Sequence, residues 1–149
     1  MKRKLFLFLS AAISIIIISI VIYKSINTVY VVKIPTDTLN KIFSENIKSE
    51  LNRREDLRLV FIDEISYTHQ IIVCEEKGNK AYIYSWLDCY GHSSETTITR
   101  VKIPAVVTLD KNNNDYSFSK LAISTAEEGL EAVKIFPYRI RNNYKVFEL

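Results

Sequence analysis

The sequence predicts an α+β domain that follows a single N-terminal transmembrane helix. Three observations lead to this: an uncharged apolar run at residues 5–23, a 3.6-residue apolar period at residues 39–51, and then several short runs rich in β-branched and aromatic residues. We expect an amphipathic helix, then an antiparallel meander of about five strands and a short C-terminal helix, with the helices on one face of the meander. A chain of 149 residues can build one such domain.

The apolar run reads LFLFLSAAISIIIISIVIY and has no charged residue. As a helix it is about 28 Å long, close to the hydrocarbon thickness of a bilayer. The basic flank MKRK at residues 1–4 predicts a cytoplasmic N-terminus, because basic residues favour the cytoplasmic side. We therefore expect a single-pass protein of the cell membrane with a transmembrane anchor at 5–23, a connector at 24–35 and an extracytoplasmic domain at 36–149.

A cleaved signal peptide is the alternative for the same segment. Its apolar region is typically about 7–15 residues long and is followed by small residues at the cleavage site. Here the run is longer and ends in Val21, Ile22, Tyr23 and Lys24. It contains no cysteine that could carry a lipid. These features favour an uncleaved anchor.

The charge distribution bears on partners. The net charge is +3, but four of the 20 basic residues flank the apolar run, so the rest of the chain is close to neutral beside its 17 acidic residues. Nucleic acid is therefore not an expected partner, since phosphate binding needs a clustered basic face. The expected partners are the lipid bilayer, through residues 5–23, and a protein of the cell envelope. Glu75 and Glu76 are predicted to lie on solvated faces.

The helix and strand signals follow in order. The connector contains VYVVKI at residues 29–34, which has β character and can add an edge strand. The amphipathic helix begins near Pro35, and one of its faces is apolar. That face consists of Leu39, Ile42, Phe43, Ile47 and Leu51.

The predicted strands are LRLVFIDEIS, THQIIVCEE, KAYIYSWLDCY, RVKIPAVVTLD and YSFSKLAIS. Gly78-Asn79 and KNNND at 111–115 predict tight turns, and residues 91–99 predict the longest loop. Thr125 and Glu128 fit a capping box, which predicts a last helix at about 126–135 that stops before Pro137. Cystatin-like and ketosteroid-isomerase-like folds share this order of elements.

The stretch WLDCYGHSS at residues 86–94 holds the densest chemistry. A turn at Gly78-Asn79 predicts that His69 lies opposite Asp88 on the neighbouring strand. These two are the weak catalytic candidates, as an acid–base pair. Tyr82, Tyr84 and Trp86 are weak ligand-binding candidates beside them. The structural interpretation, a polar cross-strand contact and a core aromatic stripe, is favoured for both.

Cys74 and Cys89 are predicted to share a face about 20 Å apart, too far for a disulfide, so two buried free thiols are expected. Cys89 and His92 form half of a zinc-like pattern, but four ligands are needed and no metal site is predicted. A nucleophilic pair of the same two residues lacks a basic neighbour in the sequence. Nucleotide-binding and metalloprotease motifs are missing, so no cofactor is expected.

A series of segments resembles small secreted or membrane-anchored domains of low-GC Gram-positive bacteria. The segments are AYIYSWLDCY, GHSSETT, IPAVVTL, KNNNDYSF and a late IFP, within residues 67–140. The resemblance implies an envelope location and supplies no catalytic residue.

We therefore expect a non-catalytic binding or accessory module of the cell envelope. The alternative is a small enzyme or ligand-binding pocket between sheet and helix, which would use His69, Asp88 and the nearby aromatic residues. An inhibitor or immunity-type domain is a third possibility for which no sequence feature argues.

Overall fold

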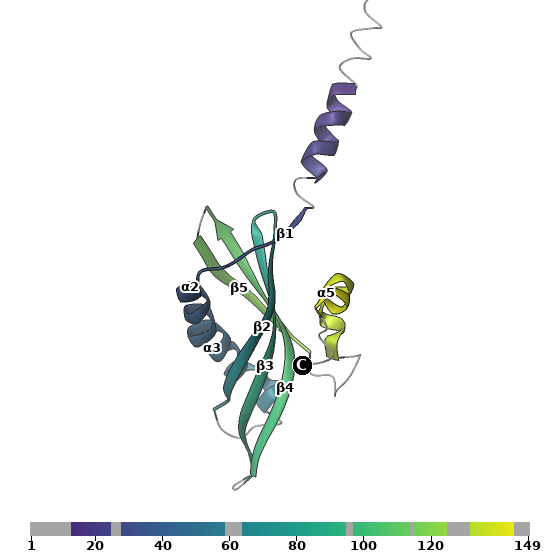
Figure 1. The fold of residues 1–149 in the computed structure, drawn as a ribbon. Helices are drawn as coiled ribbons and strands as arrows, with labels where there is room; N and C mark the ends of the chain where they lie inside the picture. Colours follow the sequence, from purple (N-terminus) through teal and green to yellow (C-terminus); the bar gives the residue numbers. More distant parts are fainter. Residues whose placement is uncertain are drawn as a thin grey trace, which may run out of the picture.

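The computed structural model describes residues 13–24, 28–58, 64–94, 97–113, 115–124 and 132–144. They form an α+β structure around a five-stranded antiparallel sheet in the order β1-β2-β3-β4-β5 (Figure 1). Every strand pairs with its neighbour in the sequence, so the predicted meander is confirmed. The strands are β1 (Val29–Val31), β2 (Ser66–Lys77), β3 (Lys80–Ser94), β4 (Thr97–Asn112) and β5 (Asp115–Ile123).

Two of the turns between strands lie where the sequence predicted them. Gly78 has φ 62° between β2 and β3, and Asn113 has φ 57° between β4 and β5, both in the left-handed region that glycine and asparagine tolerate. The predicted loop at 91–99 is wrong, because β3 and β4 continue as a long hairpin in which Gly91 pairs with Thr99. Threonine and isoleucine in that stretch favour extended backbone.

The amphipathic helix predicted from the apolar period is confirmed. It begins after Pro35 and consists of α2 (Thr36–Lys41), a π-helical segment η1 (Ile42–Ile47) and α3 (Lys48–Arg53). It lies on one face of the sheet (Figure 1). Four of its apolar residues are buried in the main core, and Leu39 packs against that core. These four are Ile42, Phe43, Ile47 and Leu51.

The first predicted strand, at residues 57–66, is wrong at its start. A short helix, α4 (Glu55–Arg58), occupies this position, and Leu57 enters the core from it. β2 begins at Ser66, and residues 59–63 lie outside the described part of the chain. A short apolar run without clear period is compatible with either state, and here packing decided for a helix. The sheet still has five strands because β1 comes from the connector, where the sequence predicted an edge strand.

The expectation that the helices cover one face of the sheet is wrong. A 3₁₀ helix, η2 (Ala132–Ile135), and α5 (Tyr138–Asn143) cover the other face (Figure 1). The physical reason is that β3 is apolar on both sides. Ile83 and Leu87 enter the core under α2 and α3, whereas Tyr84 and Trp86 enter a second core under the C-terminal segment. Of the predicted helix at 126–135, residues 126–131 lie outside the described part.

Residues 13–24 are helical, and their side chains are exposed. Within the described residues, no helix has both the length and the apolarity required to cross a membrane. The predicted anchor extends over residues 5–23, and its first eight residues fall outside the described part.

Candidate functional site

The register between β2 and β3 changes at a β-bulge. From Lys77 opposite Lys80 to Val73 opposite Tyr84, the pairing is the one predicted from the turn. Beyond it the register shifts by one, because Ile72 is an extra residue in β2. The predicted pairing of His69 with Asp88 is therefore wrong.

The bulge separates the two catalytic candidates. His69 lies opposite Leu87, and Thr68 lies opposite Asp88. His69 stacks on Phe43 of the helix, with ring centroids 3.9 Å apart and an interplanar angle of 11°. Because successive side chains of a strand alternate, Asp88 projects from the opposite face of the sheet. One residue of insertion is sufficient to break the expected pair.

Asp88 has a partner that the sequence analysis did not assign. Nε of Arg100, on β4, donates to Asp88 Oδ1 at 2.7 Å, and the Arg100 Nη2 atom binds the other carboxylate oxygen. Hydrogen bonding by Arg100 holds the pKa of Asp88 below its ordinary value. An ionised carboxylate held by two guanidinium bonds is a structural ion pair.

The aromatic candidates form part of the second core. Tyr84 and Trp86 both meet the ring of Phe136 edge-on, each with centroids 6.0 Å apart. Tyr82 packs against the same cluster and is partly buried. The C-terminal segment thus covers the aromatic stripe, which agrees with the core interpretation.

Cys74 and Cys89 are free thiols buried in the main core. Burial raises the pKa of Cys74 to about 11 and that of Cys89 to about 12. Of His92 only the backbone pairing with Ile98 is described, and its side chain lies outside the described part. Among the described residues, no three histidine, cysteine or acidic side chains gather as a metal site.

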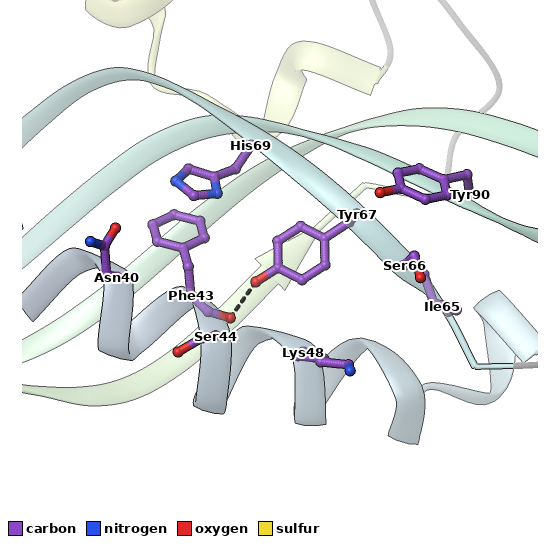
Figure 2. Close-up of a pocket in the computed structure, with 9 residues that line it drawn as sticks. All are labelled: Asn40, Phe43, Ser44, Lys48, Ile65, Ser66, Tyr67, His69 and Tyr90. Carbon is purple, nitrogen blue, oxygen red and sulfur yellow. Dashed lines mark hydrogen bonds between the residues drawn. The ribbon is translucent and has the colours of Figure 1, made fainter. Parts of the chain in front are cut away.

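A groove of about 640 Å³ runs between the helix and β2. Figure 2 shows helix residues on one wall and β2 residues on the other. It is the candidate functional site, because it combines exposed polar groups with aromatic rings in one concave surface. Its lining residues are Asn40, Phe43, Ser44, Lys48, Ile65, Ser66, Tyr67, His69 and Tyr90.

The two walls are tied together at one end by Asn52. Its side-chain oxygen accepts a hydrogen bond of 2.8 Å from the Ile65 backbone N–H, and its amide donates to the Lys48 carbonyl at 3.0 Å. Lys48 Nζ also forms an ion pair with Glu64 Oε1 at 2.8 Å, and both side chains are largely exposed. These contacts hold the start of β2 against α3.

The centre of the groove is held by Tyr67. Its hydroxyl donates to the backbone carbonyl of Phe43, within the π-helical segment (Figure 2). Burial raises the pKa of Tyr67, so its hydroxyl stays protonated. Burial also lowers the pKa of His69, so the imidazole is neutral at physiological pH. Short π-helical segments are frequent at functional sites.

The groove offers stacking surfaces, neutral hydrogen-bonding groups and the ammonium group of Lys48, which pairs with Glu64. The sequence predicted only His69 among its lining residues as a site residue, and it assigned that residue to the wrong face relative to Asp88. The others come from the helix, from the start of β2 and from β3, and no spacing in the sequence connects them. The one feature of the sequence that could have indicated the β2 wall of the groove is the uncharged run at residues 65–74.

The sequence matches no protein family, and no curated protein or solved structure is detectably similar to the chain.

Proposed function

We propose that the protein is a membrane-anchored, extracytoplasmic binding or accessory module of the cell envelope and that the groove is its binding surface. The single observation that carries the binding role is the concave surface between the helix and β2, with aromatic rings, exposed serines and an amide on its walls. Such surfaces bind rather than react unless a general acid or base is poised in them.

The membrane part of the proposal rests on the N-terminal segment. Ile15, Val21 and the other apolar side chains of the helix at 13–24 are more than half exposed. A helix that is apolar on all sides needs an apolar surrounding, and the acyl chains of a bilayer provide one. The basic residues at 2–4 favour a cytoplasmic N-terminus, which places the domain outside.

The topology sets the distance of the groove from this anchor. β1 begins at Val29, five residues after Lys24, and Val29 pairs with Lys77 beside the β2–β3 turn. Tyr67 lies ten residues back along β2, which corresponds to about 33 Å. The groove therefore lies toward the end of the sheet that is remote from the anchor, where it is open to a partner in the envelope.

The lining residues support a non-catalytic role. His69 is the groove's residue best suited to acid–base chemistry, and its closest described contact is the Phe43 ring rather than a carboxylate. The alternative of a small enzyme used His69 together with Asp88, and these two side chains lie on opposite faces. A carboxylate would be expected to orient and activate a catalytic imidazole.

Site-specific photocrosslinking in intact cells tests the proposal. A photoreactive amino acid replaces Ser44, which lines the groove, or Ser49, which is exposed on the same helix outside it. We expect an adduct with an envelope protein from position 44 and a much weaker one from position 49. Equal adducts from both positions, or none from either, would reject the groove as the binding surface.

A further inference from the structure

The outer edge of β2 is open beside the groove. β1 pairs only with Glu75, Glu76 and Lys77, and Val32 adds one hydrogen bond of 3.0 Å to the Cys74 carbonyl. From Val73 back to Ser66, no strand of the described chain lies on this side of β2. A row of backbone donors and acceptors is therefore available there.

The alternation of an antiparallel ladder identifies these groups. The Cys74 carbonyl faces β1, so Val73 faces β3, and the bulge makes Ile72 face β3 as well. Beyond the bulge, the N–H and C=O groups that point outward belong to Tyr67, His69 and Ile71. Two of these three residues also line the groove with their side chains.

The open edge lacks the usual protection. Exposed edge strands commonly carry charged residues or proline, which prevent pairing with other chains. Residues 65–74 contain neither a charged residue nor proline. The opposite edge of the sheet, β5, carries Asp115 and Lys120.

We propose that an extended, uncharged segment of a partner protein adds to the sheet as a strand beside β2. Its backbone pairs with Tyr67, His69 and Ile71, and every second side chain enters the groove against Phe43 and His69. Strand addition at a sheet edge gains affinity from main-chain hydrogen bonds and specificity from pockets for alternate side chains. This inference rests on the proposed binding role of the groove and gives that role a mode and a ligand class.

The anchor argues for another protein rather than a second copy of this chain. Antiparallel pairing of two β2 strands would point their β2–β3 turns in opposite directions. β2 has 12 residues and is about 40 Å long. Only residues 25–28 separate the helical residues at 13–24 from β1, too few to span that length. Two copies whose β2 strands stand upright on one membrane therefore cannot pair in this way, whereas a free segment of another protein can.

The test uses the full chain in phospholipid nanodiscs and a phage library of linear 12-residue peptides, with empty nanodiscs as the subtraction step. Each selected peptide is synthesised in two forms, one with N-methyl groups at its odd positions and one with N-methyl groups at its even positions. We expect one set to weaken binding about tenfold or more, because methylation removes hydrogen bonds to β2, and the other set to have little effect. Equal sensitivity of both sets overturns strand addition.

Variants of His69 supply the matched test on the protein. His69→Pro removes one outward N–H and is tolerable at an edge position, whereas His69→Ala keeps the N–H and removes only the ring. We expect the proline variant to weaken peptide binding about tenfold beyond the alanine variant. Equal binding by the two variants contradicts the proposal.

Amide hydrogen exchange on the unmodified chain keeps the proposal testable if the proline variant does not fold. In the free protein, the amides of Tyr67, His69 and Ile71 should exchange faster than those of Thr68 and Gln70, which face β3. Peptide binding should slow the first three at least tenfold. Groove binding that leaves them fast rejects strand addition while the proposed function stands. The same protection in a peptide-free dimer would identify a second copy as the occupant and overturn the choice of partner.

Discussion

The guanidinium of Arg139 in α5 binds the carboxylate of Glu75 in β2, with Nη2 and Oε2 2.5 Å apart and Nε 3.4 Å from Oε1. Glu75 is only 4% exposed, so without this partner its carboxylate would be buried beside no counter-charge from α5. The contact joins the C-terminal segment to the sheet beside Tyr84, whose pKa is raised to about 12, first by burial and then by Glu75. This ion pair therefore ties the C-terminal segment to the sheet beside the second core.

Replacement of Arg139 by alanine should destabilise the protein by about 2–3 kcal/mol, because a buried carboxylate loses its partner. Urea unfolding followed by the fluorescence of Trp86, the single tryptophan, measures this. Arg141→Ala is the matched control on the same helix. Its described contact is a cation–π interaction with Tyr138, worth up to about 1 kcal/mol. Equal losses in the two variants would show that the ion pair does not hold the segment.

Stability should fall when the pH drops below the ordinary range of carboxylates. Burial opposes ionisation of Glu76, but hydrogen bonds from Lys111 and Tyr116 and the charge of Lys111 lower its pKa below the ordinary value of 4.5. A depressed carboxyl pKa stabilises the folded state above the unfolded pKa, and this stability is lost as the pH falls through the folded pKa. Glu76→Gln should therefore flatten the dependence of unfolding free energy on pH below about 5. An unchanged slope in this variant would exclude Glu76 as a contributor.

Both cysteine thiols should resist alkylation in the native protein at pH 8. Their pKa values of about 11 and about 12, raised by burial, keep them protonated, and the core excludes the reagent. Iodoacetamide should label neither Cys74 nor Cys89 natively and both in denaturant without reductant, as read by mass spectrometry. Labelling of fewer than two thiols after denaturation would indicate a disulfide or another modification.

Tyr67→Phe should destabilise the protein by about 1 kcal/mol, because the Phe43 carbonyl loses a hydrogen bond within the π-helical segment. Thermal unfolding monitored by circular dichroism measures the change. Tyr90→Phe is the control on the same groove, since Tyr90 is 39% exposed, and it should change stability by less than about 0.5 kcal/mol. A loss that is equal in both variants would remove the special role of Tyr67.

The proposed membrane anchor predicts that the full chain stays in the membrane fraction after carbonate extraction. The double substitution Ile16→Arg with Ile17→Lys should release it, since each charge costs about 2.5–3.5 kcal/mol at the centre of a bilayer. Ser19→Ala in the same segment should have no effect. An impermeant amine reagent applied to intact cells should label lysines after Lys33 and spare Lys2. Labelling of Lys2 alone would reverse the topology.

Local patterns in the sequence determined the helix, the two glycine- and asparagine-rich turns and most of the strands. Burial on one face of a helix recurs every 3.6 residues, so Ile42, Phe43, Ile47 and Leu51 could be assigned to the core from spacing alone. The prediction that the two thiols are buried on one face is correct. The bulge lies between Cys74 and Cys89 along the β2–β3 pair, and both side chains still face the helix. Each of these properties depends on neighbours along the chain.

The tertiary structure alone decided the site. The bulge at Ile72 depends on how β2 packs against β3, and it moved His69 away from Asp88 by a single residue. The environment of the two acidic residues at 75–76 is set by partners that are distant in sequence. Glu75 is buried against Arg139 rather than solvated, and Glu76 is bound by Lys111 and Tyr116. The groove is likewise shared between segments that are distant in sequence, and the backbone edge beside it is open only because β1 ends at Val31. Such relationships are set by the packing of whole elements, which no local pattern of residues encodes.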